Sequence, residues 1–158
     1  MKNKVLTGLS IFLGLSILFS VIFFIRSNRP MARAQEESIQ VVKEMTDIRE
    51  IDRFYWFTRK ETSFAVLGRN QAGQAKLAIV PQTGGKVRVY DSSKGLTEYE
   101  AIQAVKKKYH PHKVIKVSLG LYEDQPTWEV VTKNENKTLN YYLLDFKTGD
   151  IGHVIKNI

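Results

Sequence analysis

The sequence predicts an α+β protein in which a single N-terminal transmembrane helix precedes two tandem αββββ units, each an antiparallel sheet packed on one helix. Three observations predict this fold. An uncharged, apolar run of 21 residues lies near the N-terminus. Helical periodicity followed by four β-rich runs then occurs twice, and the strands of the two copies superpose at a constant offset of 64 residues.

The composition narrows the classes of function. The 158 residues include 24 Lys and Arg, 16 Asp and Glu and no Cys, so the formal net charge is +8. Without Cys the chain has no disulfide framework, no thiolate metal site and no thiol nucleophile. Hydrophobic residues make up 43% of the chain, as in ordinary folded proteins, and this argues against global disorder.

Residues 5–25 are predicted to span a membrane. They carry no charge, and at about 1.5 Å per residue a helix of this length matches a hydrocarbon core of ~30 Å. The alternative is a signal peptide cleaved after Ala32-Arg33-Ala34, but the apolar run is longer than such a peptide needs. We expect a single-pass cell-membrane protein with residues 1–4 in the cytoplasm and the following domains outside the cell, because a long domain translocates largely regardless of its charge.

The rest of the chain divides into two halves that each contain one helix and four strands. The first domain, residues 30–91, has a predicted helix at 30–46 and strands at 51–58, 64–68, 77–80 and 87–90. The second, residues 96–158, opens with a capping box at Thr97 and Glu100, has a helix to about 109, and continues with strands at 113–122, 127–133, 139–146 and 151–156. Units of ~60 residues are marginal alone, so we expect the halves to pack together.

Alternation along the strands predicts a second apolar face on the sheets, opposite the helices. If Ile51, Tyr55 and Phe57 face the helix, their neighbours point the other way. The predicted opposite face includes Phe54, Trp56, Leu67, Val80 and Tyr90 in the first half and Val131, Tyr142, Leu144 and Val154 in the second. An apolar face of this size is costly to leave in water. It is therefore either an inter-domain contact or a partner-binding surface, and we favour the inter-domain contact.

The second half resembles a PepSY domain. The residues that carry the resemblance are Glu100-Ala101-Ile102 on the helix, the strand pair that follows, and the ending Asp145-Phe146-Lys147-Thr148-Gly149-Asp150. The whole chain resembles the TseB-like family of Gram-positive bacteria, also called YpmB, in which an anchor precedes two such units. In the first half Gly84-Gly85 replaces the Asp and Thr-Gly ending, so that copy is degenerate.

The resemblance implies a cystatin-like fold in each half and a non-enzymatic regulator of cell-wall elongation that contacts a class B penicillin-binding protein. It carries no catalytic, cofactor or metal residues onto this sequence. The wider PepSY and cystatin-like association implies an alternative, an inhibitor or chaperone-like module for a secreted protease.

The sequence offers few residues for chemistry. It contains no nucleophile elbow, phosphate-binding loop, dinucleotide fingerprint or zinc-protease motif, and we expect no cofactor. The run Lys106, Lys107 and Lys108 complements the negative end of a helix dipole, and with Lys113 it also forms a candidate anionic-surface patch. On an extracytoplasmic domain its partners would be lipid headgroups or teichoic-type polymers. No nucleic-acid partner is expected, because no reading element or interleaved aromatic pattern is present.

Overall fold

The computed structural model describes the backbone of residues 2–158 and the side chains of residues 8–24 and 30–158. The chain divides into two compact units, residues 1–37 and residues 38–158. Helix α1 (Lys2–Met45) begins in the first unit and ends in the second, and it joins the two predicted helical stretches across Pro30.

In the first unit, large apolar side chains are exposed along residues 8–24 of α1. Leu9, Phe12 and Phe19 are 64%, 67% and 71% exposed. Exposed apolar residues occupy consecutive positions such as 11, 12 and 13, so they surround the helix instead of forming one stripe.

Within the described residues, no helix has an apolar stretch long enough to cross a membrane. Part of the predicted span, residues 5–7 and residue 25, lies outside the described side chains.

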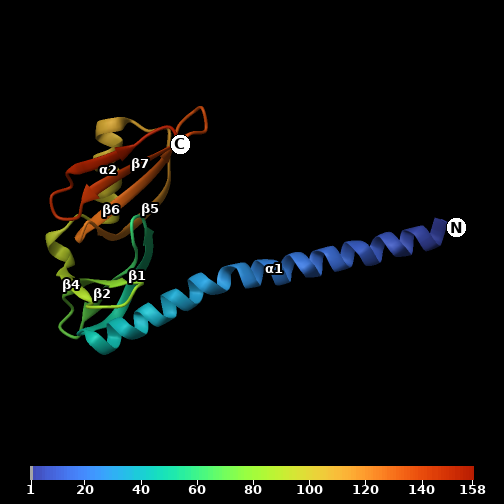
Figure 1. Ribbon diagram of the computed structural model, residues 1–158, viewed down its shortest axis with the longest axis horizontal. Helices are drawn as coiled ribbons and strands as arrows, with labels where there is room; N and C mark the ends of the chain where they lie inside the picture. The colour runs from blue at the N-terminus through green and yellow to red at the C-terminus, as the bar shows by residue number, and fades with distance from the viewer. Residues whose placement is uncertain (1) are drawn as a thin grey trace. The chain divides into compact units, whose positions relative to one another are not determined.

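The second unit contains two antiparallel four-stranded sheets (Figure 1). The strands of the first sheet, in order, are β1 (Ile48–Thr58), β2 (Thr62–Asn70), β3 (Ala75–Pro81) and β4 (Arg88–Asp91). A short 3-10 helix, η1 (Ser92–Lys94), and helix α2 (Glu98–Tyr109) follow. The strands of the second sheet, in order, are β5 (Lys113–Tyr122), β6 (Gln125–Lys133), β7 (Leu139–Asp145) and β8 (Ile151–Ile155). The predicted α+β class and the order of all eight strands are therefore confirmed.

The first sheet has a packed core on each face. On one face, Val42 from the last turns of α1 packs with Ile48, Val66 and Ala78. On the other face, Tyr55, Leu77 and Ile79 enter a larger core that also contains α2 and the inner face of the second sheet. The Tyr55 ring meets the fully buried Trp128 ring edge-on, with 5.2 Å between centroids. This shared core joins the two halves.

The predicted face of several strand residues is wrong, and β-bulges are one cause. In β1 the register shifts between Ile51 and Arg53, so Ile51 packs on the α1 side while Tyr55 enters the shared core. A single extra residue reverses the side to which every later side chain points. A bulge in β5 between Val114 and Lys116 likewise leaves Ile115 44% exposed.

Tyr142 and Leu144 also lie on the opposite side from the one predicted. Tyr142 pairs with Val130 and Leu144 pairs with Trp128, and all four residues are buried in the α2-facing core. The apolar run at residues 141–144 looks the same from either face, so the sequence does not reveal the register across the loop at 134–138.

The capping box at the start of α2 forms as predicted. The Glu100 backbone N–H donates to the Thr97 hydroxyl, and the Thr97 backbone N–H donates to the Glu100 carboxylate at 2.8 Å. Because Thr97 satisfies an otherwise unpaired helix N–H, Thr97→Ala is expected to lower the free energy of unfolding by about 1 kcal/mol, measured by urea denaturation.

The same contact makes this stabilisation depend on pH. The hydrogen bond from the Thr97 backbone lowers the pKa of Glu100 below its usual value of 4.5. A lowered carboxyl pKa stabilises the fold above the unfolded-state pKa, and this contribution is lost as the pH falls through the folded-state pKa. The stability difference between the native chain and Glu100→Ala should therefore be larger at about pH 7 than at about pH 3. Equal differences at both pH values would contradict this role of the carboxylate.

Candidate functional site: a groove between the first sheet and α2

A groove of about 460 Å³ opens where the first sheet meets the N-terminus of α2. We call it the inter-sheet groove. Its lining residues come from β1, β2, the loop before α2, α2 itself and the residue that follows β7: Asp52, Arg53, Tyr55, Leu67, Gly68, Ser92, Leu96, Thr97, Glu98, Tyr99, Ile102 and Phe146. Most of the exposed lining is apolar.

Glu98 is the polar centre of the inter-sheet groove. Its Oε2 accepts a hydrogen bond from the Tyr55 hydroxyl at 2.7 Å. The same oxygen forms an ion pair with Arg53 Nη1 at 2.5 Å. Burial, together with the hydrogen bond to Glu98, raises the pKa of Tyr55 well above its usual value. The Tyr55 hydroxyl therefore stays protonated and acts as a hydrogen-bond donor, not as a base or a nucleophile.

Gly68 keeps the floor of the groove close to the neighbouring strand. A Cβ atom at this position would lie 2.2 Å from the Glu50 carbonyl oxygen and 2.8 Å from the Ile48 side chain. Only glycine allows this approach between β2 and β1. At the rim, Tyr99 on the first turn of α2 is 69% exposed.

The groove has the features of a binding site for an apolar side chain or peptide segment. It offers apolar lining residues, an exposed aromatic ring and the Arg53–Glu98 ion pair, and ligand sites commonly combine such features. The groove lining includes no histidine or lysine beside a hydroxyl group that would activate a nucleophile. Within the described residues, no group of three or more His, Asp or Glu is gathered as a metal-binding cluster.

A second set of contacts joins the halves at the β1–β2 turn. Arg59 forms an ion pair with Glu129, which also accepts a hydrogen bond from Ser118, and the Arg59 guanidinium lies 4.4 Å from the centroid of the Tyr141 ring. Glu129 is only 4% exposed. This pair fixes the position of the β1–β2 turn on the second sheet.

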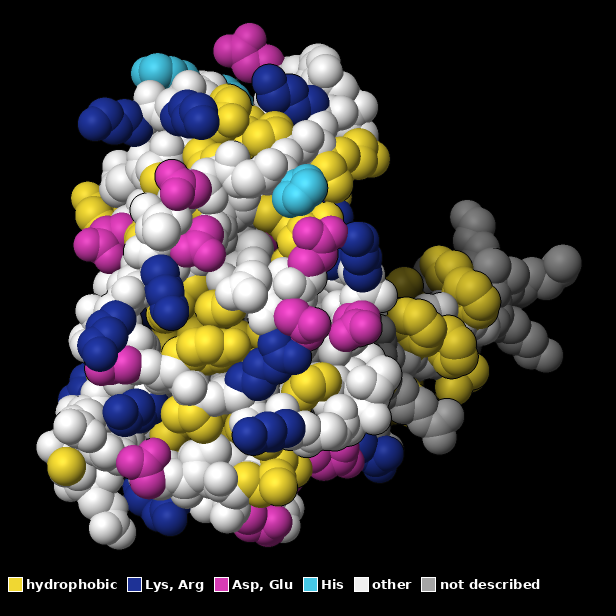
Figure 2. Space-filling model, turned by 60° about the vertical axis from the view of Figure 1, so that its left-hand side comes forward, with side chains coloured by type: hydrophobic (Ala, Val, Ile, Leu, Met, Phe, Trp, Pro, Cys, Tyr) yellow, Lys and Arg dark blue, Asp and Glu magenta, His cyan; other side chains and the backbone are white. Residues whose placement is uncertain are grey.

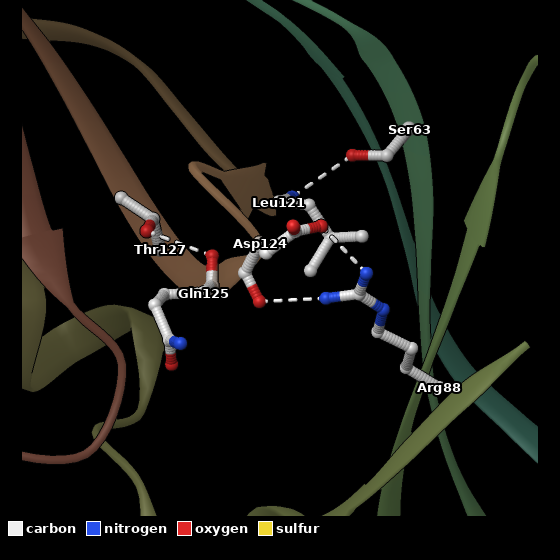
Figure 3. A network of polar contacts seen from close by, with 6 residues as sticks. All are labelled: Ser63, Arg88, Leu121, Asp124, Gln125 and Thr127. Atoms are coloured by element: carbon white, nitrogen blue, oxygen red, sulfur yellow. Dashed lines mark hydrogen bonds and ion pairs between the residues drawn. The ribbon is translucent and has the colours of Figure 1, made fainter.

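The end of β5 and the turn that follows it provide further contacts to the first sheet (Figure 3). Arg88 on β4 reaches the carboxylate and the backbone carbonyl of Asp124, each at 2.6 Å. The Ser63 hydroxyl accepts a hydrogen bond from the backbone N–H of Leu121. The joint between the halves therefore combines an apolar core with directional polar contacts.

Comparison with known proteins gives two findings. Residues 37–81 match the family described as the cell wall elongation regulator TseB-like domain. The fold is similar to a solved structure of the YpmB protein from Bacillus subtilis, with a TM-score of 0.69 and 25% sequence identity over 77% of this chain and 95% of that chain. Residues 37–81 are therefore similar to a TseB-like domain. The predicted resemblance to the TseB/YpmB-like family is confirmed by the two findings together. No curated protein matches the chain.

The segment that matches the TseB-like domain, residues 37–81, contains most of the predicted apolar-face residues of the first half. Phe54 packs on the α1 side and stacks on Phe64, and Trp56 meets the same Phe64 ring edge-on. Leu67 lines the inter-sheet groove, and Leu67 and Tyr90 both pack against the shared core. The structure thus separates the predicted set into two faces, and only Leu67 reaches the groove. A binding role for Phe54 and Trp56 stays a prediction.

The four predicted patch lysines lie at the opposite end of α2 from the groove. Lys106, Lys107 and Lys108 occupy the last turn of α2, and Lys113 begins β5. All four are exposed. The 12 residues of α2 place this end about 18 Å from the helix N-terminus at the groove.

Sequence reasoning missed Arg53, Glu98 and Tyr99 as site residues. Glu98 was visible only as part of a helix start, and Arg53 sits beside the bulge in β1. The feature of the sequence that could have indicated a binding site was Tyr99, an aromatic residue in the solvent-facing first turn of an amphipathic helix. An exposed aromatic ring at such a position is a common feature of protein-binding surfaces.

Proposed function

We propose that the protein is a membrane-anchored, extracytoplasmic regulator of cell-wall elongation that binds a class B penicillin-binding protein and does no chemistry itself. The match of residues 37–81 to the cell wall elongation regulator TseB-like domain is the observation that carries this proposal. The fold similarity to YpmB supports it over most of the chain.

The apolar part of α1 supports the proposed membrane anchor. Apolar side chains are exposed around residues 8–24, and such a surface is costly in water but favourable in lipid. Together with the uncharged residues on either side, this gives the 21-residue span of the sequence. The orientation that we propose, with residues 38–158 outside the cell, matches the site of cell-wall synthesis.

The inter-sheet groove is the surface that we assign to the penicillin-binding protein. Its apolar floor suits an apolar side chain of the partner, and the exposed Tyr99 ring has the amphipathic character that binding hot spots favour. The Arg53–Glu98 pair at its edge provides polar groups that orient a bound segment.

The proposal is tested by the binding of the full chain in detergent to a purified class B penicillin-binding protein, measured by biolayer interferometry. Tyr99→Ala should weaken binding by about fivefold or more, because truncation of a central interface aromatic costs more than about 1 kcal/mol. Val89→Ala is the matched control, since Val89 is 45% exposed on β4 outside the groove lining. Absence of binding would contradict the proposed function, and equal weakening by both variants would contradict the assignment of the groove.

A further inference from the structure

We infer that the protein has a second binding surface, at the C-terminal end of α2, for a linear polyanion that carries phosphodiester charges and free hydroxyl groups. We call this surface the basic end. It consists of residues 104–116, 131–140 and 154–158, which the strand pairing brings together. Lys113 pairs with Lys133 across β5 and β6, and Leu139 and Ile158 exchange two backbone hydrogen bonds.

Positive charge is concentrated in the basic end. Eight of the 19 Lys and Arg in residues 38–158 lie there with a single acidic residue, Glu135, whereas the other 11 share the rest of the unit with 13 Asp and Glu. The eight are Lys106, Lys107, Lys108, Lys113, Lys116, Lys133, Lys137 and Lys156. Among the side chains that the structure describes, ion pairs involve Arg53, Arg59, Lys60, Arg69, Arg88 and Lys94 and none of these eight. Figure 2 shows basic and histidine side chains beside an acidic side chain at the upper end of the molecule, with further basic side chains lower on the same face.

The dipole of α2 accounts for only part of this charge. The C-terminus of a helix is equivalent to roughly half a negative charge, which the three lysines of the last turn more than balance. Lys113, Lys133 and Lys156 lie on or beside strands and have no such role. Lys108 and Lys156 approach the same Tyr109 ring, at 5.6 and 5.5 Å, which places two uncompensated cations close together.

A polar recess of about 460 Å³ lies within the basic end. Its lining includes His110, His112, Asn134, Asn136 and Asn140, together with the acidic Glu135. Hydrogen bonds from Asn140 to Asn134 and from the Thr138 backbone to Asn136 hold its loop in a fixed shape. Amide and imidazole groups of this kind donate to and accept from hydroxyl groups.

The residue types favour a repeating polyanion over a single bound anion. All eight cations are Lys, while the five Arg of residues 38–158 lie elsewhere. Lysine is a hydrated point charge without the planar fork with which arginine grips one phosphate or carboxylate. Several such charges bind a chain of charges additively and in a salt-dependent way. A hydroxyl-bearing polymer also uses the recess, which the flat surface of a bilayer would leave empty.

Soluble poly(glycerol phosphate) is the probe that tests this inference, with the full chain in detergent micelles. Lys107→Glu, Lys113→Glu and Lys156→Glu together should weaken its binding on the order of 100-fold, measured by fluorescence anisotropy of the labelled polymer. The matched control reverses the exposed Lys43, Lys86 and Lys147, which gives the same change in net charge outside the basic end. The control should weaken binding by less than about threefold, since charges beyond a Debye length are screened.

Binding measurements with other ligands identify the chemistry that the basic end recognises. Binding of the native chain should weaken as salt is raised, and uncharged polyglycerol should not bind. Glycerol 3-phosphate, dihexanoyl phosphatidylglycerol below its micelle concentration, and a single-stranded oligonucleotide of equal charge should each bind at least about tenfold more weakly than the polymer. Equal losses in the two triple variants, or equal binding of a single phosphate or of the oligonucleotide, would overturn the inference. The polymer test needs no penicillin-binding protein, so its result is independent of the proposed function; only the cell wall as the source of the polymer rests on that function.

Discussion

Replacing Trp128 with alanine is expected to lower the free energy of unfolding by about 3–5 kcal/mol, the usual cost of removing a large aromatic side chain from a core. Trp128 is fully buried in the shared core. Its indole N–H donates to the Leu96 carbonyl at 2.9 Å, and its ring meets Tyr55 from the first sheet. The substitution therefore removes apolar contacts, a hydrogen bond and the aromatic contact between the halves.

Urea denaturation of the full chain in detergent measures this loss, with far-UV circular dichroism as the readout. Trp56→Ala is the matched control because Trp56 is only partly buried and bonds to Thr58 on its own strand. We expect the control to cost no more than about 1 kcal/mol. Similar losses in both variants would contradict the description of Trp128 as the link between the halves, as would a Trp128→Ala chain in which the first sheet keeps native stability.

Glu129→Ala is expected to have the second-largest effect, lowering the free energy of unfolding by about 2–4 kcal/mol. Removing one partner of a buried ion pair leaves the other charge without compensation, which costs about 3–5 kcal/mol when both are fully buried. Arg59 is 21% exposed, so water recovers part of that cost. The substitution also removes the acceptor for the Ser118 hydroxyl.

Glu123→Ala is the control for this prediction. It breaks the Lys60–Glu123 pair, which also joins the β1–β2 turn to the second half but has side chains that are 68% and 53% exposed. Exposed ion pairs contribute less than about 1 kcal/mol. The double variant Arg59→Met and Glu129→Leu should recover most of the lost stability, since an apolar pair can replace a buried ion pair. If the double variant is as unstable as Glu129→Ala, the unpaired arginine is not the cause of the loss.

The elements could be predicted from the sequence wherever local chemistry determines them. Turn residues and alternation placed all eight strands, and the predicted strand at residues 113–122 has the observed bounds of β5. The capping box fixed the start of α2 because both of its hydrogen bonds lie within four residues. Side-chain faces were harder, because the bulge between Ile51 and Arg53 leaves no trace in the hydrophobic pattern yet reverses every later position of β1.

The inter-sheet groove could not be predicted, because its parts meet only in the tertiary structure. Arg53 and Glu98 are 45 residues apart in the sequence, and the contact between them depends on how the first sheet packs on α2. Leu67 was predicted on the correct face because β2 has no bulge near it. The lysines of the last turn of α2 were also identified in advance, because charge on a helix end is a local property.

Site-specific photo-crosslinking in living cells tests the central claim most directly. A photoreactive phenylalanine analogue at position 99 is expected to form a covalent adduct with a class B penicillin-binding protein, while the same analogue at position 89, outside the groove lining, gives little of that adduct. Tyr99 is suited to this replacement because its ring is 69% exposed. Adducts at position 99 that contain no penicillin-binding protein, or the same adduct at equal yield from position 89, would contradict the claim that the inter-sheet groove binds the cell-wall synthase.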